Sequence, residues 1–117
     1  QELFNNNIEE LKKNFSSFSY SDAATREAMK EIYATSNYVP DPHGAVGYLG
    51  CKEYLRENPN AQCVFLETAH PVKFLDVVEE TLDVKVAIPS QIEAVMGKEK
   101  KFQKIKTYEE LKTYLNS

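Results

Sequence analysis

The sequence predicts a helix-rich α/β fold that contains a short, buried parallel sheet. Apolar side chains recur every three or four residues over much of the chain, which is the spacing of amphipathic helices. Pro42 and Pro71 each stand where a helix would begin, because proline is favoured in the first helical turn. Between them, residues 63–66 form a continuous apolar run, Cys-Val-Phe-Leu, of the kind found in a strand buried on both faces. We therefore expect helices packed around one short parallel sheet.

Two helices are expected before residue 40. The first covers about residues 2–14, because four apolar residues three or four positions apart share one helix face: Phe4, Ile8, Leu11 and Phe15. The second covers about residues 22–36. Ser21 is a good N-cap for it, Asp22 places a negative charge in its first turn, and Asn37 is a suitable end.

A third helix is expected over about residues 42–57. Pro42 restricts Asp41 to extended geometry, so Asp41 is placed as the N-cap and Pro42 as the first helical residue. The run 58–60, Asn-Pro-Asn, ends the helix. Three glycines lie three residues apart and share one side of it: Gly44, Gly47 and Gly50. Each costs about 1 kcal/mol relative to alanine in a helix interior. This favours tight packing at that side over direct contact with a flat ligand.

Three more helices are expected in the rest of the chain. One covers residues 71–82 and carries an apolar stripe. A short one lies between Pro89 and Gly97. The last follows a capping box, in which Thr107 is the N-cap and Glu110 is its reciprocal partner.

Composition and charge narrow the class of protein. The length of 117 residues supports one domain, residues 1–117. The net charge of -4, from 14 basic and 18 acidic residues, argues against a nucleic-acid partner. No apolar run approaches the ~20 residues that span a bilayer, so no membrane partner is expected. Cys51 and Cys63 fit neither a metal-binding spacing nor a disulfide framework, and the two histidines match no zinc motif. We expect no metal site, and a reduced, cytoplasmic setting.

Two short runs hold both histidines of the chain. The first is Asp41-Pro42-His43-Gly44-Ala45-Val46-Gly47, and the second is Glu67-Thr68-Ala69-His70-Pro71-Val72-Lys73-Phe74. In order and spacing they resemble the C-terminal part of threonine synthase, a lyase that depends on pyridoxal phosphate (PLP). The resemblance extends more loosely from about Ser21 to Met96. At Gly44 and Val72 the chain departs from the residues common in that family, Thr and Ala, without losing a group that is given a role here.

The resemblance implies both a fold and a function. The chain would be the C-terminal fragment of a PLP enzyme of the tryptophan-synthase fold type. The parent would convert O-phospho-L-homoserine and water to L-threonine and phosphate. In that family the Schiff-base lysine and the loop that holds the cofactor phosphate lie upstream of the matched region, and no such motif occurs in this sequence. We therefore expect no catalytic residue in this chain, an inactive fragment without bound PLP, and the rest of the parent chain as its partner.

The resemblance also gives roles to five residues. Thr68 would hydrogen-bond the pyridine nitrogen of PLP, at the C-terminal end of the predicted strand, where open α/β sheets place their ligands. Asp41 and His43 would lie near the cofactor. His70 and Lys73 would bring positive charge to the substrate phosphate. The residues alone leave plainer roles open. Asp41 and Thr68 could cap a helix or a turn, and the other three, His43, His70 and Lys73, could be ordinary solvent-exposed surface residues.

Two rival classes of protein stay open. One is a fragment of another PLP lyase of the same fold type, which the histidine–proline pair in both runs disfavours. The other is a stand-alone α/β binding or interaction module, for which the absence of a PLP lysine and a phosphate loop would be natural. The reading frame upstream of Gln1 separates the fragment from the module, because a fragment continues into a PLP-lysine motif and a module has a start codon nearby.

Overall fold

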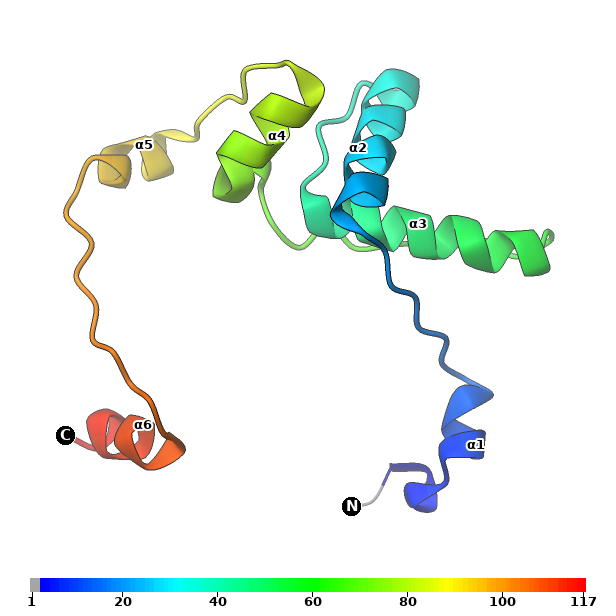
Figure 1. Cartoon of the computed structure of the whole chain (residues 1–117), viewed down its shortest axis with the longest axis horizontal. Coiled ribbons are helices and arrows are strands. Elements are labelled where there is room, and N and C mark those ends of the chain that lie inside the picture. Colours follow the sequence, from blue (N-terminus) through cyan, green and yellow to red (C-terminus); the bar gives the residue numbers. More distant parts are fainter. Residues whose placement is uncertain (1–2) are drawn as a thin grey trace. The chain divides into compact units, whose positions relative to one another are not determined.

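The computed structural model describes residues 3–117, and every regular element in that range is a helix (Figure 1). In chain order, with η for a 3-10 helix, they are η1 (Leu3–Asn6), α1 (Ile8–Lys12), α2 (Asp22–Ser36), α3 (Pro42–Glu57), η2 (Pro71–Phe74), α4 (Leu75–Leu82), α5 (Ser90–Met96) and α6 (Tyr108–Leu115). The chain divides into two compact units between Ala87 and Ile88, and each is described by itself. The expectation of one domain over residues 1–117 stays a prediction.

The predicted boundaries of α2 are confirmed, and local chemistry explains them. The hydroxyl of Ser21 accepts a hydrogen bond from the Ala24 N–H at 3.3 Å and so caps the first turn. At the other end Asn37 adopts a left-handed conformation with φ 55°, and its N–H donates to the Tyr33 carbonyl at 2.9 Å. An asparagine tolerates this conformation better than most residues, so the helix ends there.

The predicted boundaries of α3 are confirmed as well. Asp41 is extended, and its side chain accepts a hydrogen bond from the His43 N–H at 2.9 Å. Pro42 is the first helical residue, where its missing N–H leaves no bond unmade. The helix ends at Glu57, just before Asn58 leaves helical geometry.

Three helices of the first unit form its core, with α2 packed against both α3 and α4 (Figure 1). The buried apolar residues come from all three: Ala28, Met29, Ile32, Ala45 and Val78. At the edge of the core, Arg26 of α2 donates to the Thr81 hydroxyl of α4 at 2.7 Å and forms an ion pair with Glu80 at 3.0 Å. These contacts hold α4 against α2.

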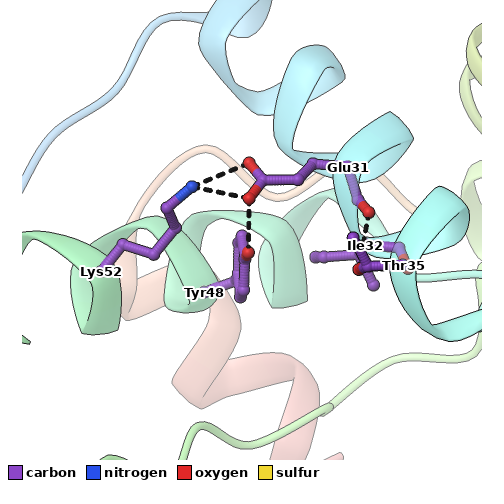
Figure 2. Close-up of polar contacts among 5 residues, drawn as sticks. All are labelled: Glu31, Ile32, Thr35, Tyr48 and Lys52. Carbon is purple, nitrogen blue, oxygen red and sulfur yellow. Dashed lines mark hydrogen bonds and ion pairs between the residues drawn. The ribbon is translucent and has the colours of Figure 1, made fainter.

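A polar network fixes α2 against α3 at the margin of the core (Figure 2). The Glu31 carboxylate accepts the Tyr48 hydroxyl at 2.8 Å and the Lys52 ammonium at 2.7 and 2.8 Å. The hydrogen bond from Lys52 and then that from Tyr48 lower the pKa of Glu31. Because Tyr48 and Lys52 are four residues apart on α3, both reach the same carboxylate.

The prediction of one helix over residues 2–14 is wrong for most of that range, and residue 2 lies outside the described residues. The structure has the turn η1 followed by the five-residue helix α1. Three consecutive asparagines explain the break, because asparagine side chains bond to nearby backbone and favour turns and caps. Asn7 caps α1 by accepting from the Glu9 N–H at 3.0 Å, while Asn5 and Asn6 have left-handed φ values of 50° and 56°.

The predicted strand over residues 63–66 is also wrong, and with it the α/β fold class and its buried parallel sheet. This segment is not hydrogen-bonded to any strand in the described chain. Val64 and Leu66 are 86% and 78% exposed, whereas Cys63 and Phe65 are half-buried on the side that faces α3. A strand buried on both faces needs neighbours on both sides, and the described residues supply α3 on one side alone.

The predicted helix over residues 71–82 is confirmed in extent but not in type. Its first turn is η2, and α4 continues from Leu75. The break lies at Phe74, whose φ of -129° and ψ of 37° are not helical. In the second unit, α5 and α6 lie where they were predicted, and Thr107 caps α6 by accepting from the Glu110 N–H at 3.2 Å. None of the helices in the described range has the length and apolar character needed to cross a bilayer.

Candidate functional site

The two histidine-containing runs meet at the N-terminal end of α3. The carboxyl group of Glu67, from the second run, lies against Gly44 of the first. The His43 ring packs on the Phe74 ring, with centroids 4.9 Å apart and planes tilted by 53°. Residues that are far apart in sequence are thus neighbours in the fold, and the N-terminal turn of α3 is the place where a shared site would form.

Asp41 orients His43 at this turn. One carboxylate oxygen, Oδ1, accepts both the His43 backbone N–H and the His43 Nδ1, each at 2.9 Å. Because an ionised carboxylate only accepts, Nδ1 carries the proton of that bond. The opposite ring nitrogen, Nε2, is then an acceptor in the neutral imidazole. The His43 side chain is 64% exposed, so this acceptor is available to a ligand.

The second oxygen of Asp41 has a different environment. Asp41 is fully buried, and its Oδ2 atom has no hydrogen-bond donor among the described residues. Burial acts to raise the pKa of Asp41, but the His43 N–H, the Glu67 carboxyl and the His43 ring outweigh it and hold the pKa below its usual value. Asp41 is therefore an ionised, buried acceptor, and its Oδ2 atom lacks a hydrogen-bond donor among the described residues.

Among the described residues, Glu67 has the most strongly shifted pKa. Burial of its carboxyl end, and then the neighbouring Asp41 carboxylate, raise the pKa of Glu67 to about 7. The residue as a whole is exposed, but its carboxyl atoms lie where a side chain at position 44 would begin. Only a glycine at that position leaves room for them.

The glycine stripe of α3 is filled by side chains of this chain. A Cβ atom built at Gly47 would lie 3.3 Å from the Cβ of Phe65, and one at Gly50 would lie 3.4 Å from the Cδ2 of Phe18. Together with Glu67 at Gly44, these contacts occupy the whole stripe. The packing interpretation of the stripe is therefore confirmed, and the contacts come from residues outside the helices.

The remaining predicted site residues follow the 63–67 segment and lie at the surface. Thr68 is exposed, and no described residue forms a hydrogen bond with its hydroxyl. His70 is exposed too, and its Nδ1 accepts the Val72 N–H at 3.1 Å, which caps η2. Lys73 is exposed and pairs with no acid in the described range. The roles given to Asp41, His43, Thr68, His70 and Lys73 toward a cofactor or substrate stay predictions.

Other parts of the described chain offer no competing site. Among residues 3–117 no three His, Cys, Asp or Glu side chains gather closely enough to hold a metal ion. One hollow, of about 710 Å³, is lined by residues between Gln103 and Ser117 and includes neither run. A smaller one of about 280 Å³ lies beside His43 and is lined also by Tyr20, Asp22, Thr25, Pro42 and Val46.

Sequence reasoning gave no role to Glu67, although the residue stands directly before Thr68. Its own signal was weak, because an exposed glutamate after an apolar run is ordinary. The combination was informative: a glycine in the first turn of a helix leaves space for a side chain from elsewhere, and an acid stands in the partner run.

Comparison with known proteins supplies the family. The sequence model described as "Threonine synthase, C-terminal" matches residues 44–115. Three curated relatives, each named threonine synthase, illustrate the similarity. The protein of Buchnera aphidicola subsp. Acyrthosiphon pisum is 39% identical over 93 residues, which is 80% of this chain and 21% of the relative. That of Escherichia coli strain K12 is 34% identical over 92 residues, 79% of this chain and 21% of the relative. That of Saccharomyces cerevisiae is 37% identical over 81 residues, 64% of this chain and 16% of the relative.

The chain thus spans about a fifth of the length of the curated relatives it matches. No solved structure matches it. The family match begins at Gly44, so it includes residues 44–47 of the first run and all of the second, whereas Asp41 and His43 precede it. The resemblance seen in the two runs is confirmed, and the chain belongs to the threonine synthase family, matching its C-terminal part.

Proposed function

We propose that this chain is the C-terminal part of a cytoplasmic threonine synthase, a carbon–oxygen lyase that acts on a phosphate ester. The whole enzyme would convert O-phospho-L-homoserine and water to L-threonine and phosphate with PLP. The observation that carries the proposal is the meeting of the two family runs at one helix end, in a chain whose residues 44–115 match the family. The rest of the parent chain would be the partner that completes the site.

The residues present fit one end of PLP. The Thr68 hydroxyl is exposed and unbonded among the described residues, so it is available to the pyridine nitrogen. A hydroxyl can donate to an unprotonated nitrogen, whereas a carboxylate there would favour a protonated ring. When bound, PLP supplies an electron sink for carbanion chemistry. The covalent lysine and the phosphate loop would come from outside these residues.

The other site residues would orient ligands and move protons. Asp41 holds His43 with Nδ1 protonated, which leaves Nε2 as an acceptor for a donor group of cofactor or substrate. His70 and Lys73 are exposed cationic or neutral donors, suited to a phosphate group. None of these residues is proposed as the covalent catalyst, so the isolated 117-residue chain should release no phosphate from O-phosphohomoserine.

The proposal is tested with the protein that the complete reading frame containing this sequence encodes. Purified with PLP, it should release one phosphate for each L-threonine formed from O-phosphohomoserine. A frame that opens just before Gln1, or a long PLP protein that processes other amino acids and not this substrate, would contradict the proposal. The first result would favour a stand-alone module, and the second would favour another PLP lyase of the same fold type.

Thr68 offers a matched pair of variants in that protein. Thr68→Ser keeps the hydroxyl and should keep most of the activity. Thr68→Val keeps the shape but loses one hydrogen bond, a net loss of about 0.5–1.5 kcal/mol, or about 2- to 12-fold weaker PLP retention. If both variants retain PLP and turn over like the unmodified protein, Thr68 is only a turn residue.

A further inference from the structure

We propose that Glu67 is a positioning residue of the candidate site: its protonated carboxyl donates a hydrogen bond to Asp41 Oδ2 and so clamps the chain just before Thr68 onto the N-terminal end of α3. We call this Glu67–Asp41 contact the clamp, and it is inferred from the geometry of this chain alone. Its consequence for cofactor binding, through the neighbouring Thr68, rests on the function proposed above.

The first support is the unmet oxygen of Asp41. The residue is 0% exposed, and its Oδ1 already accepts both hydrogen bonds from His43. Its Oδ2 is buried without a donor in the described chain. A buried acceptor that has lost its water is costly unless a donor replaces the water. Two neighbouring groups could supply a donor: the Tyr38 phenol, which forms no hydrogen bond with Asp41 among the described residues, and the carboxyl of Glu67, once it carries a proton.

The second support is the place that Gly44 leaves for this carboxyl. The three atoms of the Glu67 carboxyl group are the nearest neighbours of a Cβ built at Gly44, and all are too close for a real side chain to coexist with them. Glycine therefore admits Glu67 to the first turn of α3, beside Asp41. An alanine there would have to push the carboxyl out.

The surrounding charges leave the proton on Glu67. His43 faces Oδ1 of Asp41 from α3, and the Tyr38 phenol lies near both carboxyls, with its pKa raised by burial, Glu67 and Asp41 in that order. Burial and the Asp41 carboxylate raise the pKa of Glu67 to about 7 and outweigh the Asp41 backbone N–H, which acts to lower it; no described lysine or arginine adds to that lowering. Since Asp41 stays ionised, Glu67 is the member of the pair that holds a proton below neutral pH.

Loss of that proton should open the clamp. Two carboxylates would then face each other at the start of α3, and repulsion would move the Glu67 side chain and the adjoining Thr68 away from it. The position of Thr68 should therefore depend on pH, with a midpoint set by Glu67.

The clamp is tested by carbon-13 NMR of the 117-residue chain, with Glu67 labelled at its carboxyl carbon. We expect a titration midpoint near 7, with the Thr68 amide resonance moving at the same midpoint. A midpoint near the ordinary value of 4.5, or a Thr68 amide that does not follow Glu67, would overturn the proposal.

Four variants sharpen this test. Glu67→Gln keeps a donor at every pH, so its Thr68 amide should stay at the low-pH position up to pH ~8, whereas Glu67→Ala should keep it at the high-pH position. Gly44→Ala should expel the carboxyl and lower the Glu67 midpoint toward 4.5. Gly50→Ala is the matched control on the same helix and should leave the midpoint near 7. Gly44→Ala with an unchanged midpoint would contradict the clamp, and the two Glu67 variants decide the question if Gly44→Ala does not fold.

The consequence for the cofactor is tested in the protein from the complete reading frame. If only the clamped state binds PLP well, the dissociation constant should rise up to about tenfold between pH 6 and pH 8, and Glu67→Gln should remove this rise. An equal rise in Glu67→Gln would mean that Glu67 does not position the site. A protein that binds no PLP at all, while the NMR midpoint stays near 7, would refute the proposed function and leave the clamp intact.

Discussion

The glycines of α3 allow a graded test of how residues 63–67 pack on this helix. Replacing glycine by alanine in a helix interior gains about 1 kcal/mol of intrinsic stability. At Gly50 the new Cβ would lie 3.4 Å from Phe18 Cδ2, an ordinary contact with a ring atom that can swing aside. At Gly47 it would lie 3.3 Å from Phe65 Cβ, which is fixed to the backbone of the extended segment. The same substitution should therefore have different effects at the two positions.

We expect Gly50→Ala to raise the free energy of unfolding by about 1 kcal/mol. Gly47→Ala should gain clearly less or lose stability, because Phe65 and its backbone must shift. Phe65→Gly removes the opposing Cβ, so it should restore the gain of Gly47→Ala, with a coupling energy of about 1 kcal/mol in the double-mutant cycle. Gly50→Ala should not couple to Phe65→Gly.

The measurement is urea denaturation of the 117-residue chain at fixed pH, followed by far-UV circular dichroism. Equal gains for Gly47→Ala and Gly50→Ala, together with no coupling to Phe65→Gly, would refute the packing of this segment on α3. The placement of Glu67 at the start of α3, with Thr68 next to it in the chain, would then have no support from this segment.

Three further predictions concern the core, the pH dependence and a thiol. Met29→Ala should lower the unfolding free energy by about 2–5 kcal/mol in the same urea assay, because Met29 is fully buried between helices; a loss below about 1 kcal/mol would contradict this core. The folded-state pKa of Glu67 is raised from 4.5 to about 7, so its contribution to stability is fully present below pH 4.5 and is lost as the pH rises through 7. The ~2.5-unit difference sets an upper bound of about 3.4 kcal/mol, which solvent screening of this exposed residue reduces to about 1 kcal/mol. Urea titrations at two pH values should show this decline in the unmodified chain and not in Glu67→Gln, and equal declines would reject the assignment. Burial, then Cys63, raise the pKa of Cys51, so iodoacetamide should modify Cys51 slowly at neutral pH, and rapid modification in the native chain would show that the thiol is not shielded.

The sequence predicted those parts of the fold that depend on neighbouring residues. Ser21 and Asn37 define α2, and Asp41 with Pro42 starts α3, because caps and proline act on the backbone within one turn. The same local reasoning failed at the start of the chain, where the asparagine preference for turns outweighed the apolar spacing.

The other error, at residues 63–66, and the omission of Glu67 both involve partners that are distant in sequence. An apolar run at residues 63–66 has the composition of a buried strand, but a strand also needs neighbouring strands, and composition does not supply them. The role of Glu67 depends on its approach to Gly44 and Asp41, which only the folded chain reveals. The two family runs are neighbours in the folded chain, and the structure added the carboxyl pair at the place where they meet.

A chimaera tests most directly whether this chain can serve as the C-terminal part of a threonine synthase. The 92 matched residues of the Escherichia coli enzyme would be replaced by those of this chain, and by those of the Buchnera aphidicola relative as a control. In cells that lack threonine synthase, we expect the chimaera to restore growth without threonine, and its Thr68→Val form to restore it poorly. A soluble chimaera that fails while the control succeeds, or a Thr68→Val form that works as well as the parent chimaera, would contradict the account.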